Sequence, residues 1–126
     1  MRKTLDALNA WAGLLGACGV AAAAAAAHMP GGESLRSVAL VLLVHAAALP
    51  GLTARARESS AGGRLWLAAA LATALGAALF SADVARLTLR GARLFPFAAP
   101  AGGTAMILGW LIASVAGLAD LFRGYP

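Results

Sequence analysis

Four polar side chains stand inside or at the ends of long apolar stretches, and they are the residues that could carry chemistry. They are His28, His45, Ser81 and Asp83. A histidine can ligate a metal or transfer a proton near neutral pH, and an acid within a membrane is by default a candidate ion or proton site. Their spacing matches no metal-ligand cluster, nucleophile elbow or phosphate-binding loop. We therefore predict that the protein is not an enzyme and has no metal site and no cofactor.

Asp83 follows an uncharged stretch, residues 65–82, that spans about 27 Å as a helix. We therefore expect the acid at the far membrane interface rather than at the bilayer centre. Arg86 and Arg90 stand three and seven residues later on the same helix face, and this spacing permits an ion pair between Asp83 and Arg86. We interpret Asp83 as a structural anchor, with an ion or proton site as the alternative.

His45 lies ten residues into an apolar block and therefore deep in the membrane. A buried neutral imidazole needs a hydrogen-bonding partner, which neighbouring helices could offer as a hydroxyl, a carbonyl or the amide of Asn9. We interpret His45 as a packing residue, with a functional role as the alternative. His28 ends the first apolar block at a different depth, so the two histidines do not form a haem-ligating pair.

Composition places these residues in a membrane protein. The chain has 126 residues, is 61% hydrophobic and 12% charged, and has a mean hydropathy of +0.81. A soluble domain of this length cannot bury so much apolar surface. One cysteine excludes an internal disulfide. The net charge of +5 comes from residues at the borders of apolar blocks, where they contact lipid headgroups, so the lipid bilayer and not nucleic acid is the predicted partner.

Four apolar blocks are each about 27–37 Å long as helices and so can cross a bilayer. Helices are required because lipid cannot satisfy open backbone groups, and the glycines and prolines of the connections stop them. We predict one all-α transmembrane domain over residues 1–126, an integral membrane four-helix bundle with short loops. The predicted helices cover residues 7–27, 35–52, 65–89 and 99–121.

Basic residues indicate the orientation of these helices. With four spans, both termini and the middle loop share one side, which holds six basic residues against four on the other. This bias favours cytoplasmic termini. Arginine outnumbers lysine nine to one, as in GC-rich bacterial genomes, so we predict a multi-pass protein of the bacterial inner (cytoplasmic) membrane. The start resembles a secretory signal, with a lipoprotein-like box ending at Cys18, but Asp6 and Asn9 interrupt its apolar core and favour an uncleaved helix.

Small residues at four-residue spacing predict close contacts between the helices. Lipid is as apolar as leucine, so membrane helices associate through close packing and polar contacts. We interpret the stripes as bundle packing, with a homo-oligomer interface as the alternative. They are Ala101, Ala105, Gly109, Ala113 and Gly117 in the last block, Gly13, Ala17, Ala21 and Ala25 in the first, and Ala70, Ala74, Ala78 and Ala82 in the third.

Two segments, GAALFSADVARL and RLFPFAAPAGGTAMILGWLIASVAGL, resemble a small membrane family, domain of unknown function 423, which includes the animal transmembrane protein 256. The first matches the family's Leu-Phe-Ser-Gly-Ser segment and the second its Thr-Pro-x-Gly-Gly segment leading to Gly-Trp. The matching residues are Leu79, Phe80, Ser81, Pro100, Gly102, Gly103, Gly109 and Trp110.

The resemblance also places both histidines. GACGVAAAAAAAH resembles the family's Gly-Ala-x-Gly-Ala-His segment and ends at His28, and His45 resembles its second-helix histidine. Asp83 departs from the pattern because a small polar residue usually stands there. The resemblance implies a four-helix membrane protein and no established activity.

The order of the blocks places the candidate residues at one end of the bundle. Pro100 should begin the fourth helix, and Gly102 and Gly103 should let its first turn approach a neighbour closely. His28 and Ser81 should lie near this non-cytoplasmic end, with His45 beneath them.

Two functions follow as predictions. The first is a non-enzymatic protein that acts by helix association, as an accessory or assembly subunit of a larger membrane complex. The alternative is binding or transport of a small molecule, lipid or ion through a pocket around His28, His45 and Ser81. Transporters usually show internal repeats and broken helices, and we find no convincing repeat.

Overall fold

Four long α-helices joined by short loops make up the computed structural model, which describes residues 1–123. All four have the length and apolar composition of membrane-spanning helices, as in a multi-pass membrane protein. The predicted all-α four-helix bundle with short loops is confirmed. The helices are α1 (Arg2–His28), α2 (Leu35–Glu58), α3 (Gly63–Arg90) and α4 (Ala98–Phe122).

Two of the helices run well beyond their apolar blocks. α1 begins at Arg2, five residues before the apolar block, and α2 continues through a basic segment to Glu58, six residues past it. Hydropathy marks the part of a helix that crosses the hydrocarbon, whereas backbone hydrogen bonding continues into the interface. Arg55 and Arg57 occupy the last turn of α2, where positive charge is favourable beside the free carbonyls.

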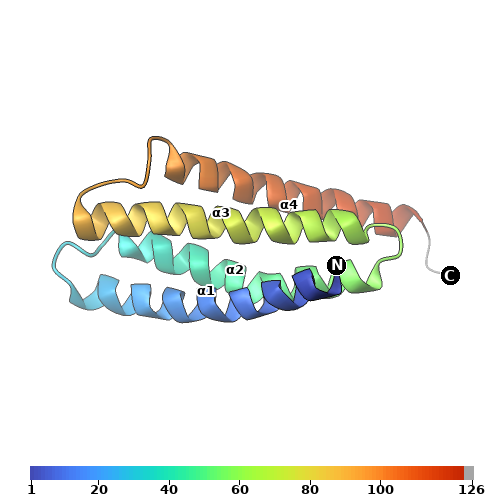
Figure 1. The fold of residues 1–126 in the computed structure, drawn as a ribbon, viewed down its shortest axis with the longest axis horizontal. Coiled ribbons are helices and arrows are strands. Elements are labelled where there is room, and N and C mark those ends of the chain that lie inside the picture. Colours follow the sequence, from blue (N-terminus) through green and yellow to red (C-terminus); the bar gives the residue numbers. More distant parts are fainter. Residues whose placement is uncertain (124–126) are drawn as a thin grey trace.

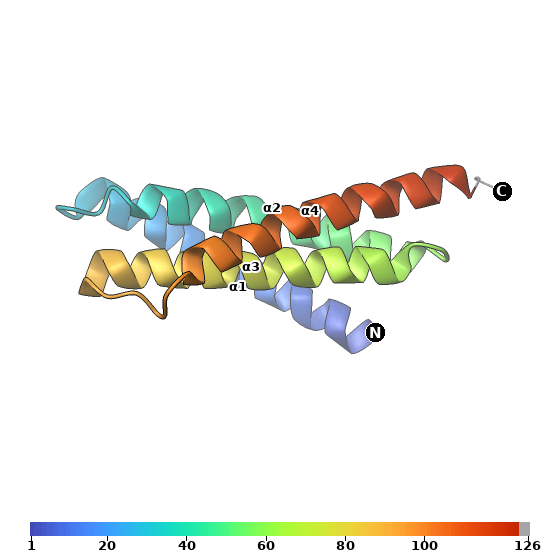
Figure 2. The same ribbon diagram turned by 90° about the horizontal axis from the view of Figure 1, so that it is seen from above.

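Each helix packs mainly on its neighbours in the sequence: α1 on α2, α2 on α3, and α3 on α4. Figure 1 shows α1 and α2 as one layer and α3 and α4 as the other, with the start of α1 at the same end of the bundle as the α2–α3 loop and the end of α4. The amino-terminal half of α1 diverges from the other helices (Figure 2). α1 and α3 touch little, which leaves a groove between them.

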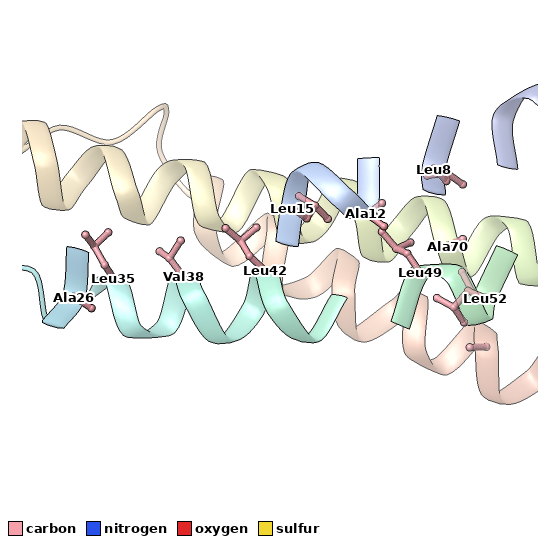
Figure 3. Packing of buried hydrophobic residues seen from close by; sticks show 13 residues of the cluster. Leu8, Ala12, Leu15, Ala26, Leu35, Val38, Leu42, Leu49, Leu52 and Ala70 are labelled. Atoms are coloured by element: carbon pink, nitrogen blue, oxygen red, sulfur yellow. The ribbon is translucent and has the colours of Figure 1, made fainter. Parts of the chain in front are cut away.

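The apolar core lies where α1 and α2 meet α3. Leucines supply most of its volume on α1 and α2, while α3 contributes alanines that let the helices come close (Figure 3). The buried residues of this cluster include Leu8, Leu15, Leu35, Leu42, Leu49, Ala69 and Ala70.

The backbones of α3 and α4 lie in direct contact. A Cβ atom at Gly102 would lie 2.6 Å from the Phe80 nitrogen and 2.7 Å from the Gly76 oxygen. A Cβ atom at Gly109 would lie 2.6 Å from the Thr73 Cγ2 atom. Such closeness gives strong van der Waals contact between helices that lipid does not drive together.

The stripe expected on α4 is only partly the contact face. Gly109 and Ala113 are buried, Ala105 and Gly117 are half-buried, and Ala101 is exposed. The buried face of α4 is rotated slightly from the four-residue stripe because a straight helix has 3.6 residues per turn. It comprises Ala98, Ala99, Gly102, Met106, Gly109, Ala113 and Ala116.

Two further glycines lie in open space instead of at a helix contact. A Cβ atom at Gly103 or Gly13 would meet nothing within 4 Å. The close approach expected of Gly102 and Gly103 together is therefore made by Gly102 alone, and Pro100 occupies the first turn of α4, which begins two residues earlier. On α1, Gly13 and Ala17 face outward.

Candidate functional site

Asp83 is fully buried and closes the loop between α3 and α4. Its carboxylate accepts hydrogen bonds from Arg93 Nη1 at 2.8 Å, from the Leu94 nitrogen at 2.8 Å and from the Ala99 nitrogen at 3.2 Å. The ion pair with Arg86 that the helical spacing permits is not formed, and Arg93 is the partner of Asp83. The reason is that Gly91 adopts a left-handed φ of 68° at the end of α3, so the following segment turns back toward Asp83.

These bonds make Asp83 an anchor for the start of α4. The first N–H groups of a helix have no partner within the helix, and negative charge is favourable there. Asp83 satisfies one of these groups, at Ala99, from the neighbouring helix. Phe97, two residues before Ala99, adopts an unfavourable left-handed φ of 65°. The hydrogen bonds from Leu94 and Ala99 to Asp83 hold the chain on both sides of Phe97.

His45 is buried and links α2 to α4. Its Nε2 atom accepts a hydrogen bond from Trp110 Nε1 at 3.2 Å, and its Nδ1 atom lies 2.7 Å from the Val41 oxygen. An indole nitrogen can only donate, so Nε2 must be unprotonated and the proton of a neutral imidazole must sit on Nδ1, which donates to Val41. Both ring nitrogens are thereby satisfied, as expected of a packing histidine.

The hydrogen-bond partners of His45 are not the hydroxyl, carbonyl or Asn9 amide that were expected from neighbouring helices. The carbonyl that it contacts belongs to its own helix, and the second partner is an indole. Asn9 instead accepts a hydrogen bond from Thr53 Oγ1 at 2.7 Å, which joins α1 to α2.

Asp120 forms a second anchor, at the opposite end of the bundle, that the sequence analysis did not identify. Its carboxylate accepts hydrogen bonds from Arg55 Nη2 at 2.7 Å, Ser59 Oγ at 2.6 Å and Trp66 Nε1 at 2.8 Å. The Arg55 guanidinium also lies over the Trp66 ring, 5.6 Å from its centroid. These contacts join α2, the α2–α3 loop and α3 to α4. A signal was available, because Asp120 ends an apolar block on the same predicted side of the membrane as the basic middle loop.

Ser81 faces a groove that lies between α1, α2 and α3. The groove has a volume of about 480 Å³, and its walls are apolar apart from Ser81 and Cys18. The Ser81 hydroxyl is buried and has no hydrogen-bond partner among residues 1–123. The walls include Trp11, Leu15, Ala22, Leu35, Leu42 and Ala85.

The candidate polar residues do not form one cluster. His28 is exposed at the end of α1, His45 contacts α4, Asp83 is enclosed by the α3–α4 loop, and Ser81 alone of the four lines the groove. Within residues 1–123, no three His, Cys, Asp or Glu side chains are close enough together to hold a metal ion.

Comparisons with family models, with curated proteins and with solved structures found no match to this chain. The resemblance to domain of unknown function 423 therefore stays a prediction that rests on the sequence segments themselves.

Proposed function

We propose that this is a non-enzymatic protein of the bacterial inner membrane that acts by helix association, as an accessory or assembly subunit of a larger membrane complex. The partner would be a helix of another membrane protein, and a second copy of this chain is the alternative partner. The outward face of α1 is the surface that would bind it.

The observation that carries this proposal is a row of mostly small residues on the outside of α1, which we call the α1 seam. Its members follow one another at alternating spacings of three and four residues, and all are exposed. This period of 3.5 keeps one face toward a partner helix, and small residues there let two backbones come close. The seam comprises the small residues Ala10, Gly13, Ala17, Ala24 and Ala27 and one larger residue, Val20.

The outward face of α4 is different in kind. It carries large side chains, among them Leu108, Leu111 and Leu118, each more than half exposed. Large aliphatic side chains suit contact with lipid tails, whereas a row of small residues leaves grooves that a second helix fills better than lipid does. The contrast favours α1 over α4 as the interface.

The alternative function, a pocket shared by His28, His45 and Ser81 for a small molecule, lipid or ion, is less favoured. These three side chains lie apart, and both nitrogens of His45 already have partners.

Affinity purification from native membranes in a mild detergent, with mass spectrometry of the bound proteins, tests the proposal. We expect a stoichiometric membrane partner with the natural chain. Gly13→Leu should abolish binding of this partner, because the leucine side chain would project from the α1 seam. The substitution should not disturb the bundle, since nothing in this chain lies within 4 Å of a Cβ atom at Gly13. Gly103→Leu is the matched control, since Gly103 is equally unobstructed but lies on α4. A partner recovered equally with both variants would exclude the α1 seam, and recovery of an unaccompanied monomer would exclude association.

The predicted orientation, with both termini cytoplasmic, is tested by reporters fused to the carboxyl terminus. A fluorescent protein that folds only in the cytoplasm should fluoresce, and a phosphatase that requires export should stay inactive. The opposite pattern would reverse the orientation.

A further inference from the structure

The Ser81 hydroxyl behaves differently from four other hydroxyls of α3 and α4. Thr73, Thr88, Thr104 and Ser114 each donate to the carbonyl four residues earlier. Ser81 makes no such bond and lies against the groove between α1 and α3. A buried hydroxyl without a partner is costly, so a missing acceptor within the groove is the simplest way to satisfy it.

Ser81 stands just inside the hydrocarbon region at one end of the bundle. Arg86 and Arg90 follow it by five and nine residues, which places them about 7 and 13 Å further along the helix, toward the headgroups. The groove itself extends along α1 from Trp11 to Met29, about 27 Å in helical rise. It therefore runs from the headgroup level across most of the hydrocarbon core, which is about 30 Å thick.

Arginines follow three of the groove-lining residues directly in the sequence. Arg36 follows Leu35, Arg86 follows Ala85, and Arg90 follows Leu89. All three arginines are exposed, and within residues 1–123 none of them forms an ion pair with a carboxylate, unlike Arg55, Arg57 and Arg93. The groove thus has apolar walls, one free hydroxyl below its mouth and three free positive charges at the level of its mouth.

We propose that this groove binds one anionic phospholipid of the bilayer. One acyl chain lies against the apolar walls, its ester carbonyl accepts a hydrogen bond from Ser81 Oγ, and its phosphate contacts the arginines at the mouth, principally Arg86. The volume of about 480 Å³ is within the range of about 300–1,000 Å³ typical of ligand sites. The charge complementarity favours an anionic phospholipid over one without net charge.

The phospholipid site is independent of the proposed association through α1. Of the α1 seam, none of Gly13, Ala17 and Val20 lines the groove. A protein can therefore lose its partner and keep the lipid, or lose the lipid and keep its partner.

Native mass spectrometry of the full chain, purified in detergent and titrated with phosphatidylglycerol or phosphatidylethanolamine, tests the site. We expect one tightly bound phosphatidylglycerol and weaker binding of phosphatidylethanolamine. Ser81→Ala should weaken phosphatidylglycerol about fivefold, the effect of one hydrogen bond. Arg86→Gln should reduce the preference for phosphatidylglycerol. Cys18→Phe, which fills the exposed groove wall, should abolish binding of both lipids.

Controls separate these effects from a general loss of structure. Ser114→Ala removes a hydroxyl on α4, and Arg64→Gln removes an exposed charge at the other end of α3, so both should bind lipid normally. Without lipid, Ser81→Ala should unfold at the same or a higher temperature than the natural chain, because it removes an unpaired polar group. Absence of a one-to-one lipid complex, or equal binding by the natural chain and all three groove variants, would overturn the proposal. So would a cross-link from Cys18 to a partner helix that displaces the lipid.

Discussion

The two outer helices, α1 and α4, both carry stripes of small residues but are held in the bundle in different ways. α4 meets α3 backbone to backbone at Gly102 and is fixed near its two ends by the carboxylates of Asp83 and Asp120. α1 rests on α2 through side chains: the atoms closest to a Cβ at Gly19 belong to Leu43, which can move. The half formed by α3 and α4 is thus tightly packed, and we call it the closed half. The half formed by α1 and α2 presents the exposed α1 seam and the groove.

This difference shows that a stripe of small residues does not itself decide where a helix packs. Both helices carry such stripes. Part of the α4 stripe is buried against α3, whereas Gly13 of α1 is exposed on the outside of the bundle. The free surface of α1 is where a function based on association or lipid binding would lie.

The largest expected effect comes from breaking the closed half. Gly102→Leu would place its Cβ 2.6 Å from a backbone nitrogen of α3, and backbone cannot move aside as a side chain can. We expect the free energy of unfolding to fall by at least about 3 kcal/mol, the upper end for overpacked sites. Thermal unfolding in detergent measures it. Gly103→Leu, one residue along, should unfold like the natural chain; similar losses for the two would show that α3 and α4 are not in contact at Gly102.

The next effect should come from releasing the loop between α3 and α4. Asp83→Ala removes the acceptor for three donors, so the loop should open and trypsin should cleave after Arg93, with a lower unfolding temperature. Arg93→Gln removes this trypsin site, so thermal unfolding is its measurement: it should lower the unfolding temperature less than Asp83→Ala, because the two backbone bonds to Asp83 remain.

Arg86→Gln is the informative control for this anchor. Arg86 makes no ion pair with Asp83, so its loss should leave the loop resistant to trypsin. An unfolding temperature lowered as much by Arg86→Gln as by Arg93→Gln would return Arg86 to the ion-pairing role that helical spacing permits.

A smaller effect is expected at the link between α2 and α4. Trp110→Phe keeps an aromatic ring but removes the donor to His45, which should lower the free energy of unfolding by about 1 kcal/mol. A double-mutant cycle with His45→Leu, read by thermal unfolding, isolates this bond. A coupling energy of zero would mean that the two rings are packed without a hydrogen bond.

The smallest effect should come from α1. Gly13→Ala adds a methyl group where nothing lies within 4 Å, and alanine favours the helix by up to about 1 kcal/mol over glycine. Unfolding should therefore be unchanged or slightly delayed. A clear destabilisation would mean that α1 packs against another part of this chain at Gly13.

Most of the fold could be predicted because lipid imposes strict limits on length and hydrogen bonding. Four apolar blocks of sufficient length leave little choice but four helices, and the confirmed bundle follows. The carboxyl end of α2 could not be placed in this way, because Arg55 and Arg57 extend the helix without extending its apolar block.

The side-chain contacts were harder to predict, for reasons that differ from residue to residue. Helical spacing gives neighbours three or four positions away, so it suggested Arg86 for Asp83 and could not find Arg93 across a turn at Gly91. His45 was expected to have partners, but a tryptophan on a helix two further along the chain is not visible in local sequence. Asp120 was missed because its partners lie on two other helices and a loop.

Photo-cross-linking in native membranes tests the contrast between α1 and α4 most directly. A photoreactive residue in place of Ala17 reports on the α1 seam, and one in place of Leu111 reports on the outward face of α4. We predict a discrete protein adduct from position 17 and lipid adducts alone from position 111. Protein adducts from position 111, with lipid alone from position 17, would contradict the assignment of α1 as the association surface.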